Sequence, residues 1–152
     1  MAIVVSHRHL VRQSSLIDQT KLDKTHVTII GCGSIGSFAA LALAKMGITN
    51  FNLYDMDTVG IENMSCQFHT FSAVGKPKAE ALAGILSNFL PNRHVPIHYN
   101  REYLKEDAGK LELYDGGNSI VILAVDSMAA RKEIVEWLIS EPVKDLYIID
   151  PR

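Results

Sequence analysis

The chain has 152 residues, of which 47% are hydrophobic and 21% are charged, as is typical of one soluble globular domain. A chain of this size buries enough apolar surface to fold without a disulfide framework or a structural metal, and its two cysteines form no paired ligand motif. The formal net charge of -2 gives no reason for binding nucleic acid or an anionic membrane, and no apolar run is long enough to cross a bilayer. We therefore expect a cytoplasmic protein with neither a nucleic-acid nor a membrane partner.

Residues 1–25 are predicted to form an N-terminal arm or short helix, because aliphatic residues are scattered through a polar stretch there. Residues 26–152 are predicted to form one domain in which strands and helices alternate. Short β-branched runs indicate strands at 26–30, 51–55, 94–99, 119–125 and 146–149. Helical spacing of small and apolar residues indicates helices at 34–46, 77–90 and 129–139, whereas residues 104–113 are ambiguous.

This alternation predicts parallel βαβ units, which must cross over with the right hand. The expected fold is α/β: a Rossmann-like, doubly wound, mainly parallel sheet of order 3-2-1-4-5, with helices on both faces. In such a sheet the ligand binds at the carboxyl ends of the strands, beside the point where the strand order reverses. Gly31, Asp55 and Asp126 each follow a predicted strand, so we expect them to converge there.

A glycine-rich loop follows the first predicted strand and opens the first helix. Its sequence, Gly-Cys-Gly-Ser-Ile-Gly, fits the pattern G-x-G-x-x-G. Glycines allow the backbone to approach a phosphate closely, and the free N–H groups of the helix favour negative charge. The residues expected to bind are Gly31, Gly33, Ser34, Ile35 and Gly36. Asp55, about 20 residues on, is placed to accept hydrogen bonds from ribose hydroxyls, so the ligand is predicted to be a nucleotide of unspecified kind.

A long polar stretch then follows Asp55, where a NAD-binding half would normally continue into a helix. It contains Asp57, Asn63, Gln67 and Lys78, the last in Gly-Lys-Pro-Lys. With these residues the chain resembles the ThiF/MoeB-type adenylyltransferases, the superfamily that includes the activating enzymes of ubiquitin-like proteins. These proteins share a glycine loop, D-x-D-x-V/I, N-L-x-R-Q, G-x-P-K and a later aspartate, and the resemblance runs from about residue 12 to residue 152.

The resemblance implies ATP-dependent adenylation of the C-terminal carboxylate of a ubiquitin-like or sulfur-carrier protein, with release of pyrophosphate. By this resemblance Asp55 and Asp57 belong to the nucleotide site, and Asn63, Gln67 and Lys78 contact the phosphates. Asp126 positions Mg²⁺, and Arg12 reaches the ATP of the neighbouring subunit in a homodimer. Lys78, Asp126 and Arg12 are thus the expected catalytic residues. No general base is needed, because the attacking carboxylate is already ionised at neutral pH.

The sequence departs from the family pattern at Cys66, which stands where the family has an arginine. Either Arg131 or Arg12 supplies the missing charge, or the site binds ATP and turns over slowly. The second half of the family, which receives the carboxyl terminus, is expected to be missing. Cys66 is expected to be a small hydrophobe rather than a catalytic thiol, and the histidines to be solvated or packed.

Three alternatives stay open at this point. The glycine loop and Asp55 also suit a NAD- or FAD-binding redox domain. The altered Cys66 position also suits a non-catalytic scaffold that retains the adenylation fold. Asp126 is alternatively only the N-cap of the helix that follows it.

Overall fold

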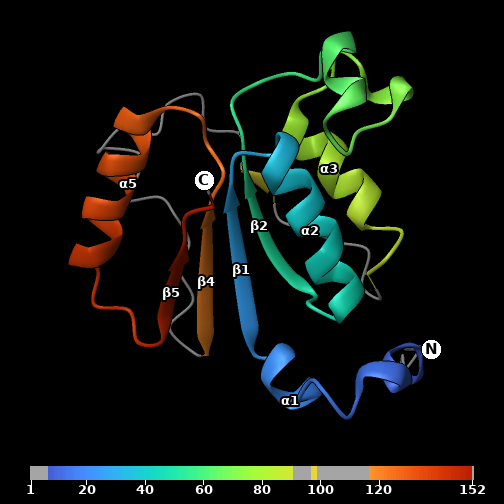
Figure 1. Cartoon of the computed structure of the whole chain (residues 1–152), viewed down its shortest axis with the longest axis vertical. Coiled ribbons are helices and arrows are strands. Elements are labelled where there is room, and N and C mark those ends of the chain that lie inside the picture. The colour runs from blue at the N-terminus through green and yellow to red at the C-terminus, as the bar shows by residue number, and fades with distance from the viewer. Residues whose placement is uncertain (1–6, 91–96, 99–116, 152) are drawn as a thin grey trace.

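The computed structural model describes residues 7–90, 97–98 and 117–151. In these residues a five-stranded parallel sheet has the order β3-β2-β1-β4-β5, which confirms the predicted topology (Figure 1). The strands are β1 (Thr25–Ile30), β2 (Asn50–Tyr54), β3 (Ile97–His98), β4 (Asn118–Leu123) and β5 (Leu146–Ile149).

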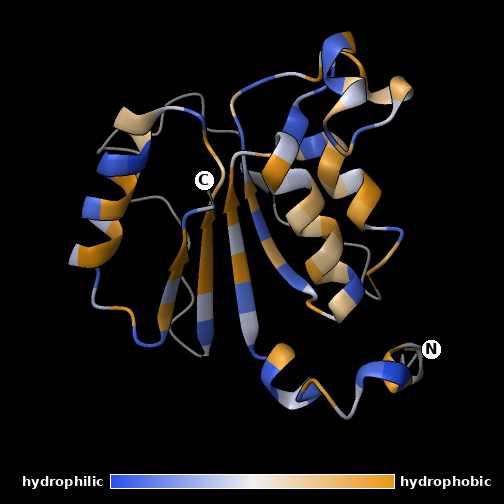
Figure 2. Cartoon of the chain, viewed as in Figure 1, coloured by the Kyte–Doolittle hydropathy of each residue, from blue (hydrophilic) through white to orange (hydrophobic). Residues whose placement is uncertain are grey.

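Helices cover both faces of the sheet. Helices α2 (Ser34–Met46) and α3 (Lys78–Leu86) pack on one face, and α5 (Met128–Ser140) packs on the other. The central strands β1 and β4 become more hydrophobic toward their carboxyl ends (Figure 2). Their side chains therefore supply both apolar cores, as expected for strands buried on two faces.

The central strands end level with one another, and this alignment creates the site. Ile30 of β1 pairs with Tyr54 of β2 on one side and with Leu123 of β4 on the other. Past these ends, the Gly31 N–H donates to the Tyr54 carbonyl at 2.8 Å, and the Ala124 N–H donates to the Ile30 carbonyl at 2.8 Å. The segments that follow the three strands therefore start side by side.

Several predicted boundaries were wrong by a few residues. The predicted strand 119–125 ends at Leu123, because β1 has already turned away at Gly31, which has φ +98°. The predicted helix 77–90 ends at Leu86, since the side chains of Ser87 and Asn88 donate to the Gly84 carbonyl and compete with the helical pattern. Of the predicted strand 94–99 only Ile97–His98 lies within the described residues, and the ambiguous stretch 104–113 lies outside them.

The N-terminal arm contains a 3-10 helix (His7–Gln13) and the short α1 (Gln19–Leu22). Leu10 is buried against Gly47, the residue that ends α2 in a left-handed conformation with φ +109°. The Gln13 side chain also donates to the Met46 carbonyl. The arm therefore packs at the end of the sheet from which the strands start (Figure 1).

The polar stretch 56–76 is more ordered than a plain loop. It contains two 3-10 helices, η2 (Ile61–Ser65) and η3 (Phe71–Ala73), above a small core of Val59, Ala73 and Ala81. Hydrogen bonds of 2.8 Å from the Val59 N–H to the Lys76 carbonyl and from the Gly75 N–H to the Val59 carbonyl close it. The stretch is therefore closed on itself and packs against α3 through Ala81.

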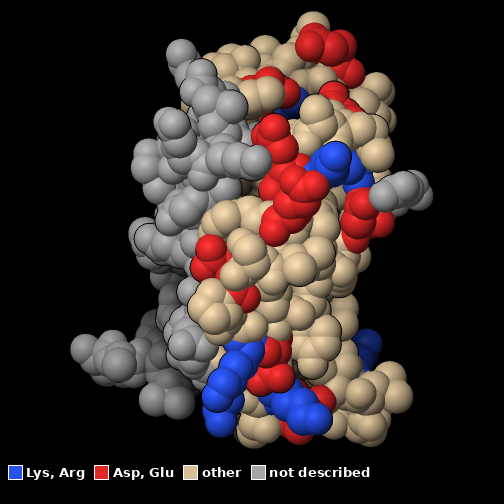
Figure 3. Space-filling model, turned by 90° about the vertical axis from the view of Figure 1, so that its left-hand side faces the viewer, with Lys and Arg blue, Asp and Glu red and all other residues tan. Residues whose placement is uncertain are grey.

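On the face that contains α5, acidic and basic side chains alternate with wide uncharged areas (Figure 3). Lys132 and Glu136 form an exposed ion pair of 3.9 Å on this helix. Among the described residues, none of the helices combines the length and apolar character that a membrane span requires.

Candidate functional site

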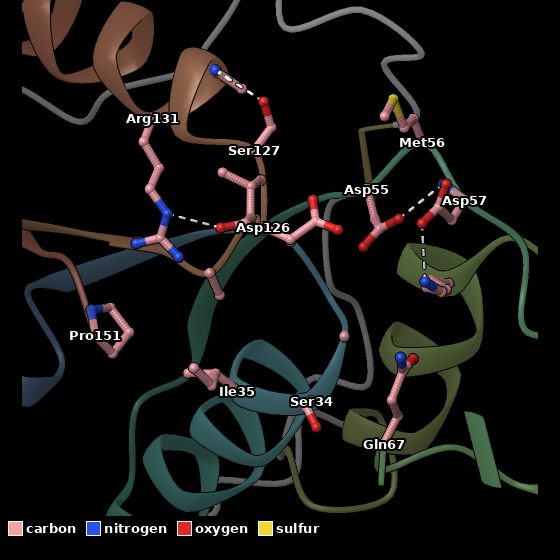
Figure 4. Close-up of a pocket in the computed structure, with 16 residues that line it drawn as sticks. Ser34, Ile35, Asp55, Met56, Asp57, Gln67, Asp126, Ser127, Arg131 and Pro151 are labelled. Carbon is pink, nitrogen blue, oxygen red and sulfur yellow. Dashed lines mark hydrogen bonds and ion pairs between the residues drawn. The ribbon is translucent and has the colours of Figure 1, made fainter. Parts of the chain in front are cut away.

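A pocket of about 440 Å³ lies at the carboxyl ends of β1, β2 and β4. Asp55, which follows β2, and Asp126, which comes after β4, project into it from either side of β1, and Gln67 enters from the polar stretch 56–76 (Figure 4). The structure therefore brings together Gly31, Asp55, Lys78 and Asp126, which the sequence places far apart. The lining residues are Gly31, Gly33, Ser34, Ile35, Asp55, Met56, Asp57, Gln67, Lys78, Ala124, Val125, Asp126, Ser127, Ala130, Arg131 and Pro151.

The glycine loop needs glycine at its first and sixth positions, Gly31 and Gly36, for reasons internal to the fold. A Cβ on Gly31 would lie 2.7 Å from the Ala124 carbonyl, and one on Gly36 would lie 1.8 Å from the Gly31 carbonyl oxygen. A Cβ on Gly33, by contrast, would meet only the Gln67 side chain, at 3.6 Å. The fold itself therefore leaves room at Gly33, on a wall that a ligand would touch.

Asp55 holds the glycine loop and the following loop with one carboxylate. Its Oδ2 accepts the Cys32 N–H at 2.6 Å, and its Oδ1 accepts the Asp57 N–H at 2.8 Å. Burial raises the pKa of Asp55, while these two N–H groups and Lys78 act in the opposite direction. Each carboxylate oxygen can accept more than one hydrogen bond, so ribose hydroxyls can still donate to it.

Lys78 supplies the positive charge on this side of the pocket. Its side chain is only 10% exposed, and its Nζ lies 2.9 Å from Oδ2 of Asp57, whose side chain is 60% exposed. The Lys78 N–H also donates to the Asp57 carbonyl at 2.9 Å, so the start of α3 is tied to the Asp57 segment twice. The more exposed member of the pair is the acid, so an anionic ligand can compete with it for the lysine.

Residues 66–69 dock on the first turn of α2. Ser34 Oγ donates to the Cys66 carbonyl at 2.6 Å, and the Phe68 N–H donates to Ser37 Oγ at 2.9 Å. This docking brings Gln67 to the pocket, where its Oε1 is buried and has no hydrogen-bond partner among the described residues. Gln67 lines the pocket, and its carboxamide nitrogen is the group that can donate to an anionic ligand.

The opposite wall is formed by the start of α5. Ser127 caps this helix by accepting the Ala130 N–H at 3.3 Å, so Asp126 is not needed as the N-cap. Asp126 is exposed, lines the pocket and makes no hydrogen bond or ion pair with the described part of the chain. Its carboxylate is therefore available to a ligand or a cation.

Not every predicted site residue lines the pocket. Asn63 lies in η2, where its Oδ1 accepts the Gly60 N–H at 2.8 Å, and Gly36 is buried behind the loop. Arg12 is exposed in the arm, at the opposite end of the sheet from the pocket, so within one chain the two are far apart. Cys66 is exposed and also lies outside the lining.

Two functional features were missed by sequence reasoning. Arg131, weighed only as a substitute cation, is held by the Val125 carbonyl at 2.8 Å and by an ion pair with Asp150. The signal for this pair was Asp150 itself, which follows the last strand as Asp55 and Asp126 follow theirs. His69, expected to be solvated or packed, lies 3.0 Å from the Cys32 carbonyl oxygen, and nothing in its local sequence indicated this contact.

Comparison with known sequences finds a match to the ThiF family over residues 6–144. Similar curated proteins include the molybdopterin-synthase adenylyltransferase of Escherichia coli, which is 31% identical over 76% of this chain and 45% of its own length. They also include the catalytic subunit of the NEDD8-activating enzyme of Arabidopsis thaliana, which is 34% identical over 74% of this chain and 24% of its own length. The tRNA threonylcarbamoyladenosine dehydratase of Bacillus subtilis is 32% identical over 76% of this chain and 44% of its own length. The chain thus spans less than half the length of these relatives.

Solved structures of similar fold include the E. coli tRNA N6-threonylcarbamoyladenosine dehydratase in complex with ATP. Its TM-score is 0.81 at 23% identity, and the match covers 99% of this chain and 61% of that one. E. coli MccB crystallised with ATP has a TM-score of 0.65 at 27% identity, and the match covers 79% of this chain and 34% of that one. Since the family match extends over nearly the whole sequence and the fold agrees with these structures, the chain belongs to the ThiF family.

Proposed function

We propose that this domain binds ATP and transfers its adenylyl group to the C-terminal carboxylate of a ubiquitin-like or sulfur-carrier protein, releasing pyrophosphate. The observation that carries the proposal is the single pocket in which the glycine loop, Asp55, Lys78 and Asp126 meet. Adenylyltransferases among the relatives, and solved neighbours crystallised with ATP, support the choice of nucleotide and reaction.

In this proposal the ribose hydroxyls donate to Asp55, whose oxygens are held in place by two backbone N–H groups. The phosphates lie against the start of α2, where the N–H groups of Gly33 and Ser34 favour negative charge. Lys78 leaves Asp57 for the phosphates, and the Gln67 carboxamide contacts them from the same side of the pocket. Asn63 would reach the phosphates only if η2 moved, because its carboxamide oxygen caps Gly60.

The reaction is an in-line displacement. A carboxylate oxygen of the partner forms a bond to the α-phosphorus, and the bond to the bridging oxygen breaks, so pyrophosphate leaves with the electron pair. Lys78 stabilises the negative charge that develops on the phosphate oxygens, and the pocket walls orient the two reactants. No residue needs to remove a proton, because the nucleophile is already ionised.

The residues present fit a bound Mg²⁺. Asp126 offers a free carboxylate at the pocket wall, and Mg²⁺ is usually bound by one or two carboxylates together with substrate phosphates. When bound, Mg²⁺ would supply positive charge to the phosphate oxygens. The chain's own contribution is the position of Asp126, which the Ser127 cap fixes at the first turn of α5.

The missing family arginine is the weak point of catalysis. Cys66 lies outside the lining, and Arg131 is committed to Asp150 and the Val125 carbonyl. Arg12 would reach ATP only on a second molecule, so we propose that a homodimer supplies this charge. The same observation favours a second candidate, a non-catalytic partner that binds ATP without transferring it.

The test is ATP–pyrophosphate exchange by the full-length protein with candidate carrier proteins, with ATP and NAD binding measured in parallel. We expect exchange that depends on a carrier with a free C-terminus and that is lost in Asp126→Asn and Lys78→Met. Lys132→Met, on the exposed surface of α5, is the matched control and should exchange normally. ATP binding without exchange for any carrier would support the non-catalytic candidate, and NAD binding without ATP binding would contradict both.

A further inference from the structure

Cys32, the second residue of the glycine loop, is held through both of its backbone polar groups. The Cys32 N–H donates to Asp55 Oδ2 at 2.6 Å, and the Cys32 carbonyl oxygen lies 3.0 Å from Nε2 of His69. A carbonyl oxygen can only accept a hydrogen bond, so His69 must carry its proton on Nε2. An imidazole from the polar stretch 56–76 thus fixes one peptide carbonyl of the phosphate-binding loop.

This contact determines which way the next N–H group points. In a trans peptide the carbonyl of one residue and the N–H of the following residue point in opposite directions. His69 is not among the pocket-lining residues, whereas Gly33 is. Holding the Cys32 carbonyl toward His69 therefore turns the Gly33 N–H away from His69, on the side where the pocket lies. If this peptide rotated, a carbonyl oxygen would replace the N–H and repel a phosphate.

The surroundings of His69 hold its ring in place and keep it in the neutral form. The preceding residue, Phe68, donates its N–H to Ser37 Oγ at 2.9 Å, and its ring packs 5.6 Å from the Phe38 ring. Nδ1 of His69 is buried and has no hydrogen-bond partner among the described residues, and burial lowers the pKa of His69. The ring is therefore neutral at pH 7, with its single proton directed at Cys32.

We propose that His69 is a positioning residue, which holds the Cys32–Gly33 peptide in the orientation that offers the Gly33 N–H to a nucleotide phosphate. This inference rests on the proposed function, because it takes the pocket ligand to be ATP. His69 itself touches neither the nucleotide nor the reacting atoms. Its effect must therefore appear in the binding of phosphates and not in the binding of the nucleoside.

The test compares His69→Phe and His69→Gln with the unaltered protein, with ATP and adenosine affinities measured by calorimetry. Phenylalanine keeps the ring and removes the donor, so we expect ATP to bind roughly 10- to 100-fold more weakly and adenosine to bind unchanged. Glutamine supplies an amide donor and should restore much of the ATP affinity. His26→Gln, on β1 at the far end of the sheet, is the matched control and should change neither affinity.

The tautomer of His69 gives a second readout, from the nitrogen chemical shifts of the imidazole in the unaltered protein. A proton on Nε2 supports the proposal, and a proton on Nδ1 overturns it, even if His69→Phe does not fold. Equal losses of ATP and adenosine affinity would also overturn it, as would unchanged ATP affinity in His69→Phe. If the unaltered protein bound no ATP, the proposed function would fail together with this inference. If the unaltered protein binds ATP and His69→Phe binds it equally well, only the inference about His69 fails and the proposed function stands.

Discussion

The glycines of the G-x-G-x-x-G pattern are needed for two different reasons: Gly36 for packing within the fold, and Gly33 for space at the pocket wall. Alanine at Gly36 would place a Cβ 1.8 Å from the Gly31 carbonyl oxygen and 3.1 Å from a methyl group of Ile29. The first distance lies far inside the 3.0 Å that real Cβ contacts respect, so the backbone itself must move. Overpacking of this kind costs about 1–3 kcal/mol, and the rigid carbonyl places Gly36→Ala at the upper end of this range.

Alanine at Gly33 should behave differently. Its Cβ would meet only the Gln67 side chain, at 3.6 Å and 3.9 Å, which are ordinary contacts. We therefore expect the stability of Gly33→Ala to stay within about 0.5 kcal/mol of the parent, while ATP affinity falls because the methyl group occupies the wall where phosphates would lie. Gly84→Ala is the control: a Cβ there meets nothing within 4 Å, and an alanine inside α3 should stabilise the protein by about 0.5–1 kcal/mol.

The assay is urea denaturation of the three variants and the parent, followed by calorimetric titration with ATP. A chain of this length shifts its melting temperature by about 2–4 °C per kcal/mol, so thermal melts give an independent check. The reasoning is refuted if Gly36→Ala is as stable as the parent, or if Gly33→Ala loses stability while its ATP affinity stays unchanged.

Further variants test other parts of the site and the fold. Lys78→Met should weaken ATP binding and leave adenosine binding unchanged, because the proposed function places the lysine against the phosphates. Calorimetry measures both affinities, and a parallel loss of adenosine binding would contradict that placement. Arg131→Ala should lower the free energy of unfolding by about 1–3 kcal/mol, because it removes the ion pair with Asp150 and the donor to the Val125 carbonyl. Urea denaturation measures this change, and an unchanged free energy of unfolding would show that the pair contributes nothing. Burial lowers the pKa values of both His26 and His69 in the folded state, so the unfolded chain takes up protons first as pH falls below about 6.5. The free energy of unfolding should therefore decrease as pH falls, and it should decrease less steeply in His69→Gln. An unaltered pH profile in His69→Gln would contradict the lowered pKa of His69. Cys66→Arg should raise the rate of pyrophosphate exchange if the missing arginine limits catalysis, and no gain would favour the non-catalytic candidate.

The fold was predictable because local residues mark where the strands and helices end. Gly31 ends the first strand, Gly47 ends the first helix, and the β-branched run before Ala124 has no other plausible structure, so the order of the strands followed from the crossover rule. The ends of elements were less predictable, since they depend on what lies beside them. Leu123 ends β4 only because its neighbour β1 has already turned at Gly31.

Some positions in the pocket were predictable because they directly follow a strand or begin a helix. These are Gly31, Asp55, Lys78 and Asp126, which all line the pocket. The site was not predictable where one residue acts on another far along the chain. The contact of His69 with the Cys32 carbonyl joins residues 37 positions apart, and Arg131 pairs with Asp150 across 19 positions. No local pattern encodes such contacts, because they arise only when the sheet is assembled.

The walls of the pocket come from segments far apart in the chain, from Gly31 after the first strand to Pro151 after the last. A nascent or partly unfolded chain in which β5 has not yet joined β4 therefore lacks one side of the cavity. A nucleotide would then bind only to the completely folded domain. A ligand present at 100 times its dissociation constant would stabilise the folded state by about 2.7 kcal/mol. If the domain binds ATP as proposed, the nucleotide would therefore stabilise the folded sheet in addition to serving as a substrate.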